Sequence, residues 1–234
     1  MPVEIPKRSK IFPDLDEADE SGLLAVGGDL SIERLKLAYS KGIFPWYEDG
    51  MPILWWSPDP RMVLFPHKMI VSHSLRQSIK KQQFTVTIDK AFEKVINNCS
   101  KTLRKGESGT WITREMKNAY IRLHKAGYAH SAESWLEGEL VGGLYGVSLG
   151  KAFFGESMFH HVTNASKVAL YHLVEKLSAW NFMIIDAQVY TNHLESLGGE
   201  MIPRSHYIHF LESALLIEDV VGSWEMRKCD NSVI

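Results

Sequence analysis

Proline is distributed very unevenly along this chain of 234 residues. Proline lacks a backbone N–H and fixes φ, so it is rare inside helices and central strands. Eight of the nine prolines lie in the first 66 residues, at Pro2, Pro6, Pro13, Pro45, Pro52, Pro58, Pro60 and Pro66, and only Pro203 lies later. The sequence therefore predicts a small N-terminal domain over residues 1–62 and a larger, differently built domain over residues 63–234.

The first domain contains one clear helix signal. Ser31 is suited to cap a helix that runs to about Lys41, where Gly42 ends it. The aromatic and proline-rich segment 43–60 is expected to be irregular.

The second domain shows alternating strand and helix patterns. Strands are expected at about 62–65, 84–88, 130–136, 139–147, 151–157 and 183–189, and helices at about 74–82, 90–98, 114–126, 164–180 and 205–216, with a short one from 192. The strands at 130–157 are joined by short turns, so they predict an antiparallel meander. The fold class is therefore α+β, with a mixed, mostly antiparallel sheet. A meander followed by helix, strand and helix resembles the acyltransferase fold of the GNAT class.

The composition is that of an ordinary soluble globular protein, with 45% hydrophobic and 23% charged residues. The two cysteines are too few for a disulfide framework, and no run of 18 apolar residues occurs, so the chain is expected to be cytoplasmic and free of the membrane. Metal-binding and nucleotide-binding motifs are also missing, so neither a metal nor a cofactor is expected.

The net charge of −2 conceals one strongly basic segment. Residues 67–105 carry nine basic and two acidic side chains. Such a segment suits a polyanionic ligand, although a solvated helical face would have the same composition.

A buried-looking strand at 184–189 carries two polar side chains, Asp186 and Gln188, two residues apart. Period-two alternation places both on one face of the strand. Burying them costs free energy unless they are paired, which makes them candidate site residues or a structural hydrogen-bonded pair. Glu156 is a second such carboxylate among apolar and aromatic neighbours, although it could also be a surface residue at a strand end.

Seven motifs in order resemble those of the bacterial leucyl/phenylalanyl-tRNA–protein transferases. They lie at 22–31, 42–46, 54–61, 109–113, 155–159, 164–167 and 185–188, and include GESMF at 155–159 and IDAQ at 185–188. The resemblance implies an enzyme that moves Leu or Phe, with Met as a further candidate, from aminoacyl-tRNA to the α-amino group of proteins beginning with Arg or Lys. Such products enter the N-degron route to proteolysis. It also implies a small N-terminal domain packed on a GNAT-like catalytic domain.

The resemblance assigns roles to individual residues. Asp186 and Gln188 match the catalytic pair, and Glu156 matches a substrate-binding glutamate. Trp46 and Trp111 match tryptophans at the adenosine end of the tRNA. The pocket for the aminoacyl side chain maps to Leu144, Phe153, Met158, Leu170, Leu177 and Ile185. Many members have Cys where this chain has Ala187, so a thiol at that position cannot carry the acyl group here.

The expected mechanism is direct attack of the amine on the ester, without a covalent enzyme intermediate. Gln188 would orient the amine, Asp186 would fix Gln188 and favour proton removal, and Glu156 with Asp186 would attract the cationic N-terminus. A general base supplied by the tRNA itself is the alternative. On the predicted helix at 74–82, Arg76, Lys80 and Lys81 are candidate contacts to the tRNA backbone.

Two other functions fit parts of this sequence. An acyl-CoA-dependent N-acetyltransferase is disfavoured because the segment 160–165, where its pyrophosphate loop would lie, has no glycine. A non-catalytic RNA-binding module would explain the basic segment and the tryptophans, but not Asp186 and Gln188 in a buried strand.

Overall fold

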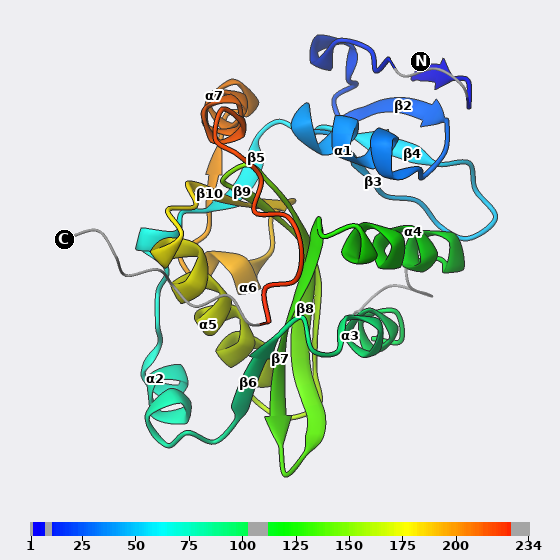
Figure 1. Ribbon diagram of the computed structural model, residues 1–234. Coiled ribbons are helices and arrows are strands. Elements are labelled where there is room, and N and C mark those ends of the chain that lie inside the picture. The colour runs from blue at the N-terminus through cyan, green and yellow to red at the C-terminus, as the bar shows by residue number, and fades with distance from the viewer. Residues whose placement is uncertain (1, 8–10, 103–111, 226–234) are drawn as a thin grey trace.

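The computed structural model describes residues 2–7, 11–102 and 112–225 (Figure 1). A small sheet lies near the N-terminus, in the order β1-β2-β4-β3, with β1 parallel to β2 and the other pairs antiparallel. Its strands are β1 (Val3–Ile5), β2 (Leu23–Gly27), β3 (Phe44–Pro45) and β4 (Leu54–Trp56). The expectation of irregular structure over 43–60 is therefore wrong for β3 and β4. Strands of two or three residues are too short to show periodicity, and Pro45 is tolerated because β3 is an edge strand.

The large sheet has the order β11-β5-β10-β9-β8-β7-β6. Its strands are β5 (Arg61–Leu64), β6 (Thr85–Ile88), β7 (Ala129–Leu136), β8 (Glu139–Leu149), β9 (Ala152–His160), β10 (Ile184–Gln188) and β11 (Glu200–Ile202). Within the described residues, β9 and β10 are its one parallel pair. The α+β class and the mixed, mostly antiparallel sheet are thus confirmed; β11, with three residues, was not predicted.

The helices lie within two residues of their predicted limits. They are α1 (Ile32–Ser40), α2 (His73–Lys80), α3 (Phe92–Cys99), α4 (Arg114–Lys125), α5 (Ala165–Ala179), the short α6 (Asn192–Glu195) and α7 (Arg204–Leu215), with 3-10 turns at Leu15–Glu17 and Pro66–Lys68. Side-chain oxygens of Ser31, Ser72 and Thr113 accept backbone N–H groups at the starts of α1, α2 and α4. The cap predicted at Ser31 is therefore confirmed, whereas α3, α5 and α7 begin without a side-chain cap.

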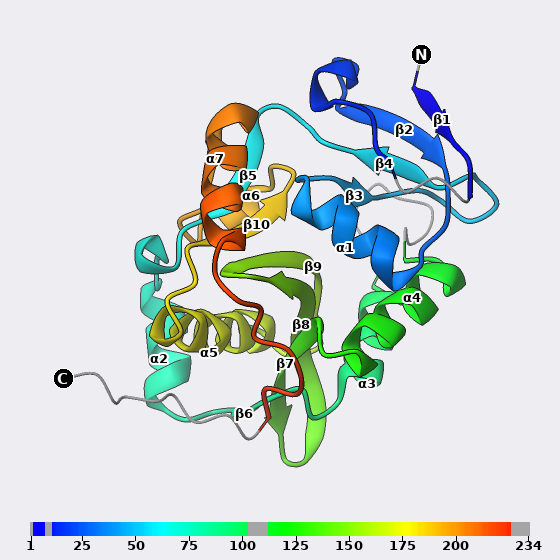
Figure 2. The ribbon, with the colours of Figure 1, turned by 45° about the horizontal axis from the view of Figure 1, so that its top comes forward.

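Helices cover both faces of the large sheet. Figures 1 and 2 both show α2 and α5 on one side, and α3 and α4 on the other. On the α3–α4 side, one continuous core joins Leu35 and Trp55 of the N-terminal part to Tyr120 and Tyr207. The small N-terminal domain is therefore packed on the larger one. The limits 1–62 and 63–234 stay a prediction, and the first strand of the large sheet begins at Arg61.

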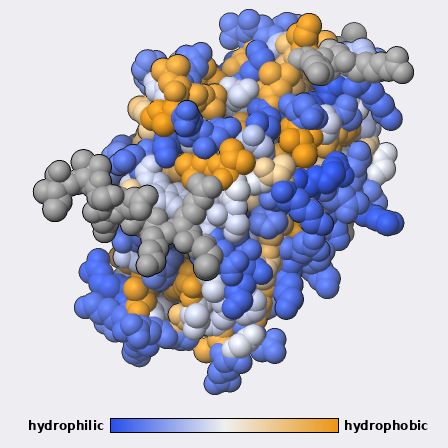
Figure 3. Space-filling view, viewed as in Figure 1, coloured by the Kyte–Doolittle hydropathy of each residue, from blue (hydrophilic) through white to orange (hydrophobic). Residues whose placement is uncertain are grey.

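Hydrophobic side chains form separate patches among hydrophilic ones on the face that Figure 3 shows. Over the described parts of the chain, no helix is both long and apolar enough to span a bilayer.

Candidate active site

A cavity of about 410 Å³ opens where β9 and β10 part. The last pair between these parallel strands joins Phe154 to Asp186, and the residues beyond it, 155–160 and 187–189, line the cavity together with parts of β3, β8, α5 and α6. Most of the lining is apolar. Beyond this pair the two strands no longer hydrogen-bond to each other, so their facing edges are open at the cavity.

The apolar part of the cavity contains most of the predicted aminoacyl pocket. Five of the six predicted residues line it, namely Leu144, Phe153, Met158, Leu170 and Ile185. Leu177 does not reach the cavity: it lies two turns beyond Leu170 on α5 and is fully buried in the core. The periodicity of α5 predicted an apolar stripe but not which part of the stripe is open to a ligand.

Trp46 stands at the rim of this cavity and is 36% exposed. Its carbonyl accepts a hydrogen bond from the indole of Trp56, and the two rings lie 5.8 Å apart. An exposed indole held in place is suited to stack on a flat ring. Trp111 lies outside the described residues.

Asp186 is completely buried and has four hydrogen-bond donors. Arg61 binds it through two nitrogens, with Nε 2.9 Å from Oδ1 and Nη2 2.7 Å from Oδ2. Tyr207 donates to Oδ2 at 2.7 Å, and the backbone N–H of Gln188 donates to Oδ1 at 2.9 Å. The charge of Asp186 raises the pKa of the buried Arg61 despite desolvation, which lowers it. Asp186 is thus a neutralised anchor for the end of β10.

Gln188 has an unusual backbone, with φ of +65° after a bulge at Ala187. Such a conformation is uncommon for a residue other than glycine and is found at functional sites. Its side-chain Nε2 donates to Glu156 Oε1 at 3.0 Å. The amide oxygen therefore lies on the other side, where no donor from the described residues reaches it, and Gln188 lines the cavity. The amide oxygen is available to accept a hydrogen bond from a ligand.

Glu156 is the extra residue of a bulge in β9 and is only 7% exposed, so it is not a surface residue at a strand end. Tyr39 donates to Oε1 at 2.6 Å and Tyr120 to Oε2 at 2.8 Å. Burial raises the pKa of Glu156 to about 7, although hydrogen bonds from Tyr39, Tyr120 and Gln188 oppose the rise.

The two phenols also contact each other, so three contacts form a triangle among Tyr39, Tyr120 and Glu156. Burial raises the pKa of both phenols well above 10, so each keeps its proton. Two phenol protons cannot fill three contacts, whereas a protonated Glu156 supplies the third. Tyr39 and the Gln188 amide both donate to Oε1 of Glu156, which holds the carboxyl against Gln188.

Sequence reasoning missed Arg61, Tyr39, Tyr120 and Tyr207 as members of the site. Tyr39 lies on the buried face of α1, and only the tertiary structure shows that its hydroxyl reaches Glu156. The sequence does not show that Arg61 is buried in the site, because its carboxylate partner Asp186 is 125 residues away in the chain.

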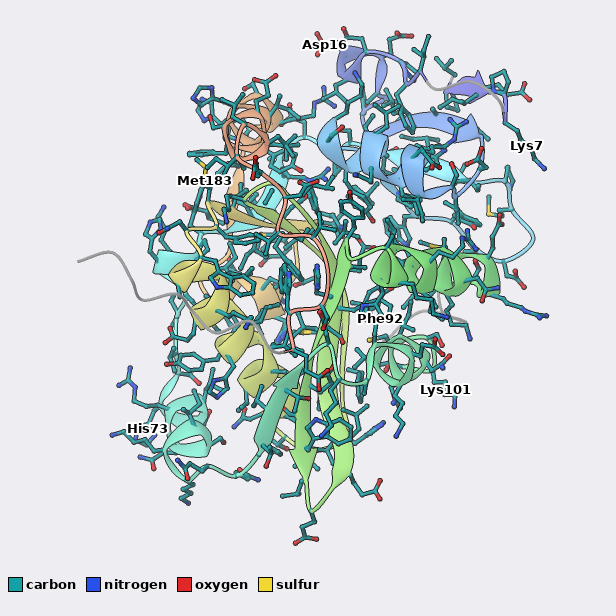
Figure 4. All side chains as sticks on the ribbon, in the orientation of Figure 1. Lys7, Asp16, His73, Phe92, Lys101 and Met183 are labelled. Carbon is teal, nitrogen blue, oxygen red and sulfur yellow. The ribbon has the colours of Figure 1, made fainter. Side chains whose placement is uncertain are left out.

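The described part of the basic segment, residues 67–102, lies on both faces of the large sheet. Figure 4 shows His73, the first residue of α2, and Lys101, just after α3, on opposite sides of that sheet. Arg76, Lys80 and Lys81 are all exposed along α2. Lys68 instead pairs with Glu200 at 2.6 Å. Within the described residues, the basic side chains of α2 and those at the end of α3 therefore form two separate candidate surfaces for a phosphate backbone.

Comparisons with known proteins identify the family. A family model described as "Leucyl/phenylalanyl-tRNA protein transferase" matches residues 63–212, more than half of the chain. This chain belongs to that family. A second model, "Leucyl/phenylalanyl-tRNA protein transferase N-terminal domain", matches residues 28–59.

Full-length relatives of this transferase family agree with the assignment. A protein of Syntrophobacter fumaroxidans named leucyl/phenylalanyl-tRNA–protein transferase is 54% identical to this chain, over 98% of both chains. A protein of the same name from Myxococcus xanthus is 53% identical to it, over 92% of both chains. Among solved structures, L-PGS from Bacillus licheniformis is 12% identical and aligns with a TM-score of 0.38, over 74% of this chain and 57% of that chain, which is too distant to support an argument.

Proposed function

We propose that this chain transfers Leu or Phe from aminoacyl-tRNA to the α-amino group of proteins whose first residue is Arg or Lys. Family membership supports aminoacyl transfer from tRNA to protein. The observation that carries the chemistry is the Gln188 amide, whose nitrogen is bound by Glu156 and whose oxygen is free at an apolar cavity. An acceptor for an amine N–H thus lies beside a pocket suited to an apolar side chain.

The reaction is aminolysis of an ester. The lone pair of the neutral amine attacks the ester carbonyl, the C–N bond forms, and the bond from carbon to the ribose oxygen breaks. The amine proton passes to that oxygen, which leaves as a hydroxyl. An α-amino group has a pKa of about 7.7–8.0, so part of it is neutral at pH 7. Holding the two reactants together therefore supplies most of the acceleration, for which orientation contributes about 7–11 kcal/mol.

Gln188 is the residue that touches the amine in this proposal. Its amide oxygen accepts one amine N–H and directs the lone pair toward the ester. Asp186 and Glu156 act through Gln188: the first holds its backbone N–H, and the second holds its side-chain nitrogen. Asp186 does not add to a negative field for the cationic N-terminus, because Arg61 neutralises it. Glu156 is the carboxyl that the cavity presents.

The remaining contacts belong to the donor. The aminoacyl side chain occupies the pocket of Leu144, Phe153, Met158, Leu170 and Ile185. Flexible Met158 suits both a branched and an aromatic guest. Trp46 and Trp111 hold the terminal adenosine, and Arg76, Lys80 and Lys81 contact the tRNA backbone.

A transfer assay tests the proposal. The protein is incubated with tRNA carrying radiolabelled Leu, and with peptides that begin with Arg, Lys or Gly but are otherwise identical. Label is expected in the first two peptides only. Binding of the tRNA without any transfer would favour an RNA-binding module, and modification of the peptides by labelled acetyl-CoA would favour an N-acetyltransferase.

A further inference from the structure

The large sheet contains four glycines on its two central strands, and three of them are required by packing. A Cβ at Gly142 would lie 2.5 Å from the Cβ of Ala165. At Gly143 it would lie 2.7 Å from a backbone oxygen, and at Gly146 only 2.2 Å from one. Real Cβ atoms do not approach so closely, so a side chain at any of these three positions would force its neighbours to move.

Gly155 on β9 is different. A Cβ there would have one neighbour within 4 Å, the backbone oxygen of Asp186 at 3.6 Å, which is ordinary van der Waals contact. Its φ does not lie in the left-handed region, unlike those of the turn glycines. Glycine inside a strand costs conformational entropy relative to alanine. Neither packing nor backbone geometry within the described structure therefore explains why this position has no side chain.

The position of Gly155 supplies an explanation. It is the first residue of β9 after the last pair with β10, and it lines the cavity. On one side along the strand is Phe153 of the apolar pocket, and on the other is Glu156, which holds Gln188. A glycine in a strand often marks a place where a ligand approaches the backbone closely.

We infer that Gly155 is a positioning residue, kept without a side chain so that the reacting end of the aminoacyl group lies directly against β9. The donor's side chain enters the apolar pocket beyond Phe153, and its carbonyl stays within reach of the amine held at Gln188. A methyl group on Gly155 would occupy the space between these two points. This inference rests on the proposed function.

The steric effect falls on the part of the donor that all aminoacyl groups share. Gly155→Ala is therefore expected to lower kcat/KM for Leu-tRNA and Phe-tRNA by a similar factor. A displacement of about 1 Å at the reacting atoms lowers rates by about 100-fold, so at least a tenfold loss is expected. Changes to pocket residues such as Leu170 would instead alter the ratio between Leu and Phe.

Gly143→Ala is the matched control, because Gly143 lies on the neighbouring strand, does not line the cavity and has no room for a Cβ. Thermal unfolding and steady-state transfer are measured for both variants. Gly155→Ala should melt at or above the wild-type temperature and lose transfer activity. Gly143→Ala should melt at a lower temperature and keep its kcat/KM at temperatures where it is folded.

A direct binding measurement separates donor positioning from other defects. The probe is adenosine that carries phenylalanine through a non-hydrolysable 3′-amide, titrated by calorimetry. Weaker binding to Gly155→Ala than to Gly143→Ala supports the inference. Equal kcat/KM for Gly155→Ala and wild type would overturn it, as would a lower melting temperature of Gly155→Ala, because the position would then be structural. Absence of transfer by the wild type would instead overturn the proposed function.

Discussion

Arg61 and Asp186 join neighbouring strands β5 and β10 through a bidentate ion pair in which both side chains are buried. Arg61 lies at the start of β5, just after the proline-rich part of the chain, and Asp186 comes two residues before Gln188. The pair therefore ties the first strand of the large sheet to the backbone that carries the reacting amide.

Breaking this ion pair on one side should be strongly destabilising. Asp186→Asn leaves the Arg61 charge buried without its counter-ion, which costs about 3–5 kcal/mol. Adding Arg61→Met removes this unpaired charge, so the double variant should be more stable than Asp186→Asn alone. Urea unfolding of the wild type, Asp186→Asn, Arg61→Met and the double variant provides the double-mutant cycle. Strictly additive changes in unfolding free energy would contradict a direct pairing.

Glu156 should make the protein less stable as the pH rises. Its folded-state pKa of about 7 lies above the ordinary value of 4.5, so the folded state holds the proton more tightly. This contribution is complete below pH 4.5 and is lost as the pH rises to about 7, a change of about 3 kcal/mol. Glutamine cannot ionise, so Glu156→Gln should lack this pH-dependent contribution to stability. The unfolding free energies of the two proteins are compared from pH 4.5 to 8; parallel curves would show that Glu156 keeps an ordinary pKa.

Two tryptophans should separate stability from binding. Trp224 is fully buried, stacks on His130 at 3.6 Å between ring centres and donates its backbone N–H to Asp89. Trp224→Ala should therefore cost about 3–5 kcal/mol of stability. Trp46 is exposed at the cavity rim, so Trp46→Ala should change stability little and weaken binding of the aminoacyl-adenosine probe. Thermal unfolding measures the stability of both variants, and calorimetry measures their binding of the probe. Unchanged probe binding by Trp46→Ala would place the adenosine elsewhere.

Helix α2 should contribute a salt-dependent part of tRNA binding. Reversing the charges of Arg76, Lys80 and Lys81 removes up to three phosphate contacts, so affinity should fall and its dependence on salt should become shallower. The matched control reverses three exposed lysines outside the basic segment, at Lys7, Lys41 and Lys125. Filter binding over a range of salt concentrations distinguishes the two. If the salt dependence of affinity equals that of wild type, the tRNA does not contact α2, and the basic surface around Lys101 after α3 becomes the candidate.

The fold was largely predictable where elements were long. The capped helices and the meander with its Glu137-Gly138 turn have strong local signals, and the structure shows them at the expected positions. The strands of the N-terminal sheet and β11 have two to five residues, and long-range pairing rather than local pattern stabilises them. Short strands of this kind are beyond a periodicity argument.

The polar residues of the candidate site could be predicted from the sequence, but their hydrogen-bond partners could not. Two polar side chains in a buried strand marked Asp186 and Gln188, and the structure gives both of them hydrogen-bond partners. The partners themselves come from β5, α1, α4 and α7, so only the tertiary structure identifies them. The bulges at Ala187 and Glu156 also have no sequence signal, and the two side chains at them, Gln188 and Glu156, are hydrogen-bonded to each other.

The central claim is that the Gln188 amide oxygen positions the attacking amine. The most direct measurement is the single-turnover rate of Leu transfer to an Arg-peptide, with enzyme saturating the donor, for wild type, Gln188→Ala and the exposed control Gln83→Ala. We expect Gln188→Ala to lose at least about 100-fold in rate while its affinity for Leu-tRNA is unchanged, and Gln83→Ala to match wild type. A Gln188→Ala enzyme that transfers Leu at the wild-type rate would contradict the account.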